Sequence, residues 1–475
     1  MSVPHPIPFD SLREQLASGE ITCERITDEY LTIIEQKKHL NAFRSVFTDE
    51  ARERSRLIDK KIATGTSGPL AGMVIAIKDV ICMESSPTTC GSKILEHFVS
   101  PYNATVIKKL ADADAIIIGK TNMDEFAMGS STENSAYGVV LNPVDETRVP
   151  GGSSGGSAVA VAANCSRTAL GTDTGGSVRQ PAAFCGVVGL KPTYGRVSRY
   201  GLVAFASSFD QIGPFGQSVR DIAHVLQVIA GHDRHDSTSA NVPVPDYLEH
   251  LTGDVRGLRI GLPKEYFADE LNEEIRNAIH GKVEILKQRG AIVKEVSLPH
   301  TEYTVATYYI LTTAEASSNL ARYDGARFGY RSPNAKDLTT MYVHSRSEGF
   351  GAEVKRRIML GTYVLSAGYY DAYYRKAQQV RRLIKQDFDN AFREVDCLIT
   401  PTSPTTAFKI GEKVDDPLTM YLSDIYTVSA NLAGVPCISI PCGTDLQGLP
   451  IGMQVFGRQF GEETILRIAD SIEKG

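Results

Sequence analysis

The hydrophobic pattern begins with a helical segment, in which apolar residues recur every three or four positions. It predicts a short helix that starts at Asp10 or Ser11 and stops at Gly19, and a longer helix that Thr22 opens. A charged third helix is predicted over 49–63, with most of its surface in solvent. Because residues three or four apart share one face of a helix, the first two helices should each bury one side.

Beyond this segment, short apolar runs alternate with helical patterns. Strands are predicted at 73–77, 115–118, 258–262, 291–298, 397–400, 437–440 and 451–456, and helices at 105–110, 275–286, within 303–392 and at 465–472. Strands that are apolar on both faces are typical of sheets covered by helices on both sides. The pattern therefore predicts an α/β fold with a covered central sheet. The polar segment 232–246, which contains two prolines, is predicted to cross the surface. We expect one domain over 1–475, with a helix-rich second lobe over roughly 235–395.

Composition and charge narrow the class of protein. The 50 basic and 56 acidic residues give a net charge of −6, which argues against a dedicated nucleic-acid binder. The eight cysteines form no C-x-x-C pair, which favours buried free thiols over disulfides or a metal site. The N-terminus lacks the apolar region of a secretory signal, and no stretch approaches ~18 apolar residues. We therefore expect a soluble cytoplasmic protein that neither spans a membrane nor binds a metal.

Two glycine–serine turns stand out in the segment 151–177, where 7 of 27 residues are glycine and 5 are serine. The turns read Gly151-Gly-Ser-Ser-Gly-Gly-Ser157 and Asp173-Thr-Gly-Gly-Ser-Val-Arg179. Turns of this kind bring backbone N–H groups close to a ligand, where they can hold a phosphate or stabilise an oxyanion. The phosphate hypothesis is the weaker one, because Gly156 is followed by Ser157-Ala158 and not by the Lys-Ser/Thr of a P-loop.

The oxyanion hypothesis needs a nucleophile and a base. Residues 151–155 match the G-x-S-x-G nucleophile elbow, but the preceding 142–150 do not have the pattern of a strand. No histidine lies between His97 and His224, although a distant histidine could still complete a Ser-His-Asp triad. A neutral lysine can serve instead, and Lys78 ends the apolar run 73–77, where burial would lower its pKa.

Lys78, Ser153 and Ser177 together resemble the Ser–Ser–Lys triad of the amidase signature family. Both turns match the family blocks, and the match continues through Gly186-Val-Val-Gly-Leu-Lys-Pro-Thr193. The resemblance implies a large central mixed β-sheet covered by helices on both faces. It also implies that Ser177 is the nucleophile, that Ser153 relays the proton and that Lys78 is the final base. Ser154 is the competing assignment for Ser153.

The same resemblance places an oxyanion hole on the second turn, formed by the backbone N–H groups of Thr174, Gly175, Gly176 and Ser177. Glycines suit this position because they admit a tetrahedral intermediate without a Cβ clash.

Further blocks resemble one branch of the family, the glutaminase subunits of tRNA-dependent amidotransferases. These blocks cover 122–135, 195–211, 314–320, 355–361 and 368–374. The resemblance implies that the chain hydrolyses glutamine and supplies ammonia to a partner subunit. That partner would convert ATP-activated Glu-tRNA(Gln), or Asp-tRNA(Asn), to the amide. It further implies a heterotrimer with B and C subunits, in which the B subunit handles most of the aminoacyl-tRNA.

Free glutamine is a zwitterion, so its pocket needs a cation for the α-carboxylate and a carboxylate for the α-ammonium. By resemblance these are Arg357 and Asp424, with Tyr308 as a hydrogen-bonding wall; the adjacent Tyr309 remains open as an alternative. Ser130 is a weaker candidate for contacting the substrate amide.

The sequence contains no nucleotide-binding motif, so ATP and Mg²⁺ are expected on the partner and no cofactor on this chain. Two other functions stay open. One is a stand-alone amidase of the same family that acts on another small amide. The other is a catalytically inactive scaffold subunit, which the presence of all three triad residues disfavours.

Overall fold

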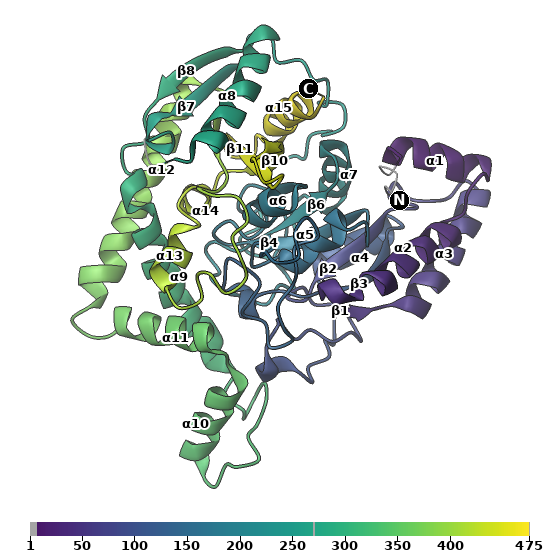
Figure 1. Cartoon of the computed structure of the whole chain (residues 1–475). Coiled ribbons are helices and arrows are strands. Elements are labelled where there is room, and N and C mark those ends of the chain that lie inside the picture. Colours follow the sequence, from purple (N-terminus) through teal and green to yellow (C-terminus); the bar gives the residue numbers. More distant parts are fainter. Residues whose placement is uncertain (1–6, 269–270, 475) are drawn as a thin grey trace.

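The computed structural model describes residues 7–268 and 271–474. In this part of the chain eleven strands form one mixed sheet, in the order β1-β3-β2-β4-β6-β5-β10-β11-β9-β7-β8 (Figure 1). The strands are β1 (Phe43–Val46), β2 (Val74–Lys78), β3 (Ile116–Thr121), β4 (Thr168–Asp173), β5 (Val188–Lys191), β6 (Gln211–Gly216), β7 (Arg259–Pro263), β8 (Ile292–Val296), β9 (Cys397–Pro401), β10 (Cys437–Thr444) and β11 (Pro450–Gly457). The predicted α/β fold with a mixed sheet is confirmed.

Parallel pairing is confined to two places in the sheet. At one of them β2 lies parallel to both β3 and β4, and at the other β7 lies parallel to both β8 and β9. All other neighbours are antiparallel. Every residue of β2, β4 and β6 is buried, so helices and loops cover both faces of the sheet where these strands lie.

Helices occupy the rest of the regular structure. They are α1 (Phe9–Ser18), α2 (Cys23–Gln36), α3 (Thr48–Ala63), α4 (Thr105–Asp112), α5 (Gly155–Ala162), α6 (Arg179–Cys185), α7 (Val219–Ile229), α8 (Glu273–Gln288), α9 (Thr304–Asn319), α10 (Leu338–Gly349), α11 (Ala352–Val364), α12 (Lys376–Glu394), α13 (Pro417–Leu422), α14 (Val428–Ala433) and α15 (Glu462–Glu473). Helices α9 to α12 form an arm that reaches away from the sheet at α10 (Figure 1). Strands β7 and β8 extend the common sheet, so the predicted lobe over 235–395 joins sheet strands to this helical arm.

The predicted N-terminal helices are present, with one different cap. Thr22 caps α2 by accepting a hydrogen bond from the Arg25 N–H, as predicted. Pro8 is the residue before α1 and provides no side-chain cap, and Asp10 and Ser11 lie inside the helix. Gly19 ends α1 in the left-handed conformation.

The strands that the sequence pattern missed are β1, β4, β5 and β6. Strands β4 and β6 contain glycine, proline or polar residues, which obscure an apolar run. Segment 232–246 contains no helix or strand, as predicted for a surface crossover. All eight cysteines are buried free thiols, which also agrees with the sequence.

Candidate functional site

The site is built around Lys78, the last residue of β2. Its side chain is fully buried, and its Nζ lies 2.8 Å from Ser153 Oγ, 2.7 Å from Ser154 Oγ and 2.9 Å from Thr172 Oγ1. Burial disfavours the charged ammonium and lowers the pKa of Lys78 to about 7, although nearby carboxylates oppose the shift. At this pKa a large share of the amine is neutral near pH 7 and can accept a proton.

The two serines of the first turn have different hydrogen-bond partners. Ser154 Oγ donates to the Thr172 carbonyl at 3.1 Å and accepts from the Thr172 N–H at 3.2 Å. Ser154 therefore links the turn to β4, and its hydroxyl hydrogen is already engaged. Ser153 Oγ hydrogen-bonds only to Lys78 among the described residues, so its hydrogen stays available for transfer. This difference favours Ser153 over Ser154 as the proton relay.

Close packing fixes the backbone of the first turn. The Gly152–Ser153 peptide bond is cis. A Cβ on Gly152 would lie 2.2 Å from Asp124 Oδ2, so this position requires glycine. The N–H of Asp124 in turn donates to the Ser153 carbonyl at 3.2 Å. Asp124 thus lies directly against the turn that carries Ser153.

Asp173 organises the second turn. Its carboxylate accepts from the N–H of Gly176 at 2.8 Å and of Val178 at 3.2 Å, and forms a buried ion pair with Arg179. Burial alone would raise the pKa of Asp173, but Arg179, Lys191 and Asn431 together outweigh it and the pKa falls to about 2. Ser177 lies in this turn with 8% of its surface exposed, and its hydroxyl has no hydrogen-bond partner within 7–268 and 271–474. A slightly exposed, unpartnered hydroxyl is open to a substrate.

The backbone of this turn has both bound and free N–H groups. The Gly176 N–H, predicted as an oxyanion donor, is already bound by Asp173. The N–H groups of Thr174, Gly175 and Ser177 form no hydrogen bond with the described part of the chain. Gly176 has φ +133°, and a Cβ there would lie 2.3 Å from Thr427 Oγ1. Glycine at 176 therefore shapes the turn, and the free donors are its neighbours.

Arg357 of α11 lies buried among aromatic rings. Its guanidinium carbon is 5.6 Å from the ring centroid of Phe205, 5.3 Å from that of Tyr309 and 5.4 Å from that of Tyr421. Its Nε donates to Glu353 Oε1 at 2.8 Å. Its two terminal nitrogens have no hydrogen bond to any residue that the structure describes, which leaves them available for a carboxylate.

Asp424 also contacts Tyr309. Its Oδ2 accepts from Ser130 Oγ at 2.7 Å and from the Tyr309 hydroxyl at 3.3 Å. Burial raises the pKa of Asp424 to about 7, which an incoming ammonium group would counteract. The structure thus brings Ser130 to Asp424, where it orients the carboxylate.

Tyr308 and Tyr309 both face this site, with their rings edge to face at 5.1 Å. A Cβ on Gly175 would lie 2.4 Å from the Tyr308 hydroxyl, so Tyr308 lies beside the nucleophile turn. Tyr309 contacts both Arg357 and Asp424. Tyr308 therefore borders the nucleophile turn, and the adjacent Tyr309 borders Arg357 and Asp424.

Other residues of the site were missed by the sequence interpretation. Thr172 hydrogen-bonds Lys78, Asp173 shapes the second turn, and Glu353 and Tyr421 position Arg357. Asp173 could have been found, because it opens the second glycine–serine turn. Glu353 could also have been found, because it lies one helical turn before Arg357 on α11. Thr172 and Tyr421 have no local signal, since long chain separations lie between them and the residues they contact.

The described residues offer no histidine base for this site, no metal cluster and no membrane-spanning helix. No described histidine hydrogen-bonds to Ser153, Ser154 or Ser177. Residues 7–268 and 271–474 contain no cluster of three or more His, Cys, Asp or Glu side chains that could hold a metal ion. Among the described helices, none combines the length and apolar character needed to cross a membrane.

Comparisons with known proteins agree with this geometry. The family model described as Amidase matches residues 25–466. The chain is 59% identical over 458 residues to the A subunit of the glutamyl-tRNA(Gln) amidotransferase of Acidobacterium capsulatum, a match that covers 96% of both chains. The protein of the same name from Koribacter versatilis is 57% identical over 469 residues, 98% of both chains.

Solved structures show the same similarity. The A subunit of the glutamyl-tRNA(Gln) amidotransferase of Thermotoga maritima matches with a TM-score of 0.80 and 46% identity, over 95% of this chain and 92% of that one. The peptide amidase of Stenotrophomonas maltophilia matches with a TM-score of 0.83 and 31% identity, over 98% and 95%. The family model and these relatives cover nearly the whole chain, and the resemblance drawn from the two glycine–serine turns is confirmed. The chain therefore belongs to the amidase family.

Proposed function

We propose that this chain is the glutaminase subunit of a tRNA-dependent amidotransferase. The observation that carries this proposal is that Arg357 and Asp424 both contact Tyr309, whose neighbour Tyr308 lies beside the turn of Ser177. A Ser–Ser–Lys site alone would suit many amides. A buried cation and a buried carboxylate beside it match the two α-charges of free glutamine. The names of the relatives, which are A subunits of glutamyl-tRNA(Gln) amidotransferases, support the same function.

The reaction starts with the hydroxyl of Ser177. Its oxygen attacks the side-chain amide carbon of glutamine, and its proton passes to Ser153 as the Ser153 proton passes to neutral Lys78. The free N–H groups of Thr174, Gly175 and Ser177 stabilise the oxyanion of the tetrahedral intermediate. Each such donor contributes ~2.7–4 kcal/mol.

Collapse of the intermediate breaks the carbon–nitrogen bond. The leaving nitrogen takes the proton back from Lys78 through Ser153 and departs as ammonia, leaving a γ-glutamyl ester on Ser177. Water then attacks the ester, Lys78 accepts its proton through the same relay, and glutamate leaves as Ser177 regains its hydrogen. The pKa of Lys78, about 7, suits both directions of transfer near neutral pH.

Ammonia must then reach an activated carboxylate. We assign ATP, Mg²⁺ and most of the aminoacyl-tRNA contacts to a partner subunit of a heterotrimer with B and C subunits, acting in the cytoplasm. The net charge of −6 supports this division, because an RNA-binding surface needs positive charge. Whether the tRNA carries glutamate or aspartate depends on that partner.

Ammonia release from L-glutamine, measured with and without the partner subunits, tests the proposal. We expect turnover of L-glutamine, at least 10-fold discrimination against propionamide, and a γ-glutamyl ester on Ser177 detectable by mass spectrometry after acid quench. Equal turnover of propionamide would favour a stand-alone amidase. Absence of both turnover and ester in the assembled complex would favour an inactive scaffold.

A further inference from the structure

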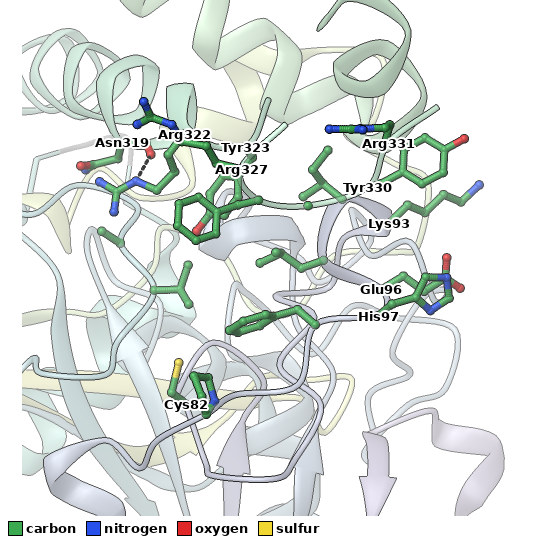
Figure 2. Close-up of a pocket in the computed structure, with 18 of the residues that line it drawn as sticks. Cys82, Lys93, Glu96, His97, Asn319, Arg322, Tyr323, Arg327, Tyr330 and Arg331 are labelled. Carbon is green, nitrogen blue, oxygen red and sulfur yellow. Dashed lines mark hydrogen bonds between the residues drawn. The ribbon is translucent and has the colours of Figure 1, made fainter. Parts of the chain in front are cut away.

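A large pocket lies outside the glutamine site, between the end of α9 and the 3₁₀ helix η2 (Lys93–Leu95). It has a volume of about 770 Å³ and is lined by residues 93–98, 202–204, 319, 322–323 and 327–331, together with Cys82, Pro101 and Tyr102 (Figure 2). Neither Ser153 nor Ser177 lines it. The proposed glutaminase reaction therefore leaves this pocket without a role.

Positive charge is concentrated around this pocket. Lys93, Arg322, Arg327 and Arg331 line it, with Glu96 as the one carboxylate (Figure 2). None of these four cations forms an ion pair in the part of the chain that the structure describes. In a protein of net charge −6, such a group of unpaired cations is a local exception that suits an anionic partner.

Exposed apolar side chains occur at the pocket, on Phe328, and on the neighbouring helix α10. Phe328 at the rim is 53% exposed, and Leu338 and Val343 of α10 are 64% and 56% exposed. Helix α10 packs against η2, so this surface adjoins the pocket. Exposed apolar side chains beside charged ones are typical of protein–protein interfaces, whereas a phosphate backbone would gain nothing from them.

Two sets of contacts lead from the pocket toward the segments that carry the glutamine site. Tyr323 lines the pocket and packs on Phe126, with ring centroids 5.2 Å apart. Phe126 comes two residues after Asp124, which holds the first glycine–serine turn. The Glu125 carboxylate accepts from Ser92, which precedes η2, and from the N–H of Gly351 at 2.8 Å, which precedes α11. A partner that receives ammonia from this site would gain from docking here.

We propose that this pocket receives an acidic segment with an apolar anchor from a partner subunit of the assembly. The cations steer and hold the acidic side chains, and the aromatic rings of Tyr323 and Phe328 pack against the anchor. This proposal rests on the proposed function, because it assumes that the chain works as one subunit of a complex.

The double variant Lys93→Glu/Arg327→Glu tests the docking surface. Neither side chain has a hydrogen bond or ion pair with a described residue, so the fold should tolerate the change. The matched control is Arg382→Glu, an exposed arginine on α12 away from the pocket lining. Each full-length chain is titrated with the purified B and C subunits encoded in the same genome, at about 50 and about 300 mM NaCl.

The Kd of the wild-type chain for the partner subunits should rise with salt. The Kd of the double variant should be at least 10-fold higher than that of wild type at low salt and should depend less on salt. The control should match wild type, and the isolated double variant should keep the wild-type rate of ammonia release. A Kd of the double variant within twofold of wild type would overturn the docking surface while leaving the glutaminase function intact. Tight binding of a tRNA transcript to the isolated chain, lost in the double variant, would overturn it in favour of a nucleic-acid site. A wild-type chain that neither binds the subunits nor hydrolyses glutamine would overturn both proposals.

Discussion

The protonation state of Lys78 sets the pH dependence of ester formation on Ser177. Burial lowers the pKa of Lys78 from 10.5 to about 7, and only the neutral amine can accept a proton. Roughly 10% of the amine is neutral at pH 6, about half at pH 7 and about 90% at pH 8. With an ordinary lysine, roughly 0.03% would be neutral at pH 7, about three orders of magnitude less. We therefore expect ester formation to rise ~10-fold from pH 6 to pH 8 and to be lost as pH falls.

The measurement is the single-turnover rate of ester formation on Ser177 at saturating L-glutamine, followed by acid quench and mass spectrometry. Saturation matters because Asp424 also has a pKa raised to about 7, and its ionisation should affect KM. Bound glutamine keeps Asp424 ionised, so the saturated rate isolates Lys78. A rate that stays constant between pH 6 and pH 8, or a Lys78→Ala variant with the same profile as wild type, would refute the assignment of Lys78 as the base.

Three further predictions concern single side chains. Ser153→Ala should lower kcat by more than ~10³-fold, whereas Ser154→Ala should keep measurable turnover. Ser154→Ala should lower the free energy of unfolding in urea by ~1–3 kcal/mol, because it leaves the backbone N–H and carbonyl of Thr172 on β4 without their partner. The reverse pattern would exchange the roles of the two serines. Gly176→Ala should lower kcat at least ~10²-fold, since its Cβ would lie 2.3 Å from Thr427 Oγ1, and wild-type turnover would show that the turn tolerates a side chain. Asp424→Asn should raise KM for L-glutamine at least ~10-fold at pH 8 while changing propionamide turnover little. An equal loss of turnover on both substrates would instead assign Asp424 to catalysis.

The elements that the sequence predicted well were those with a clean apolar pattern. Strand β2 was visible because five apolar residues precede Lys78, and their burial is also what makes this lysine a base. Strand β4 was missed because Thr168, Gly171, Thr172 and Asp173 are polar or small. Thr172 Oγ1 is bound by Lys78 and the Asp173 carboxylate by Asn431, both far away along the chain, so no local pattern reveals these contacts; Thr168 Oγ1 has no hydrogen-bond partner among the described residues.

Some residues of the candidate site could also be recognised from local sequence patterns, whereas others could not. The two turns and the strand end at Lys78 marked candidate residues locally, but the triad roles of Lys78, Ser153 and Ser177 came from the family resemblance. Arg357 and Asp424 came from a family resemblance, and read alone Arg357 looked like a surface charge on a helix. It is buried because Phe205, Tyr309 and Tyr421 surround it, and these residues come from three separate segments. Only the folded chain shows that the guanidinium keeps two unbound nitrogens.

The eight buried cysteines have a practical consequence for following this protein in solution. Burial raises the pKa of every one of these thiols, so the reactive thiolate is scarce in the native chain. Unfolding releases eight thiols per molecule, so a chromogenic disulfide reagent should count unfolded chains directly. By the same logic, a cysteine introduced at the exposed Ala326 should take up a maleimide dye selectively. Such a dye would report assembly at the rim of the pocket without removal of a native residue from the core.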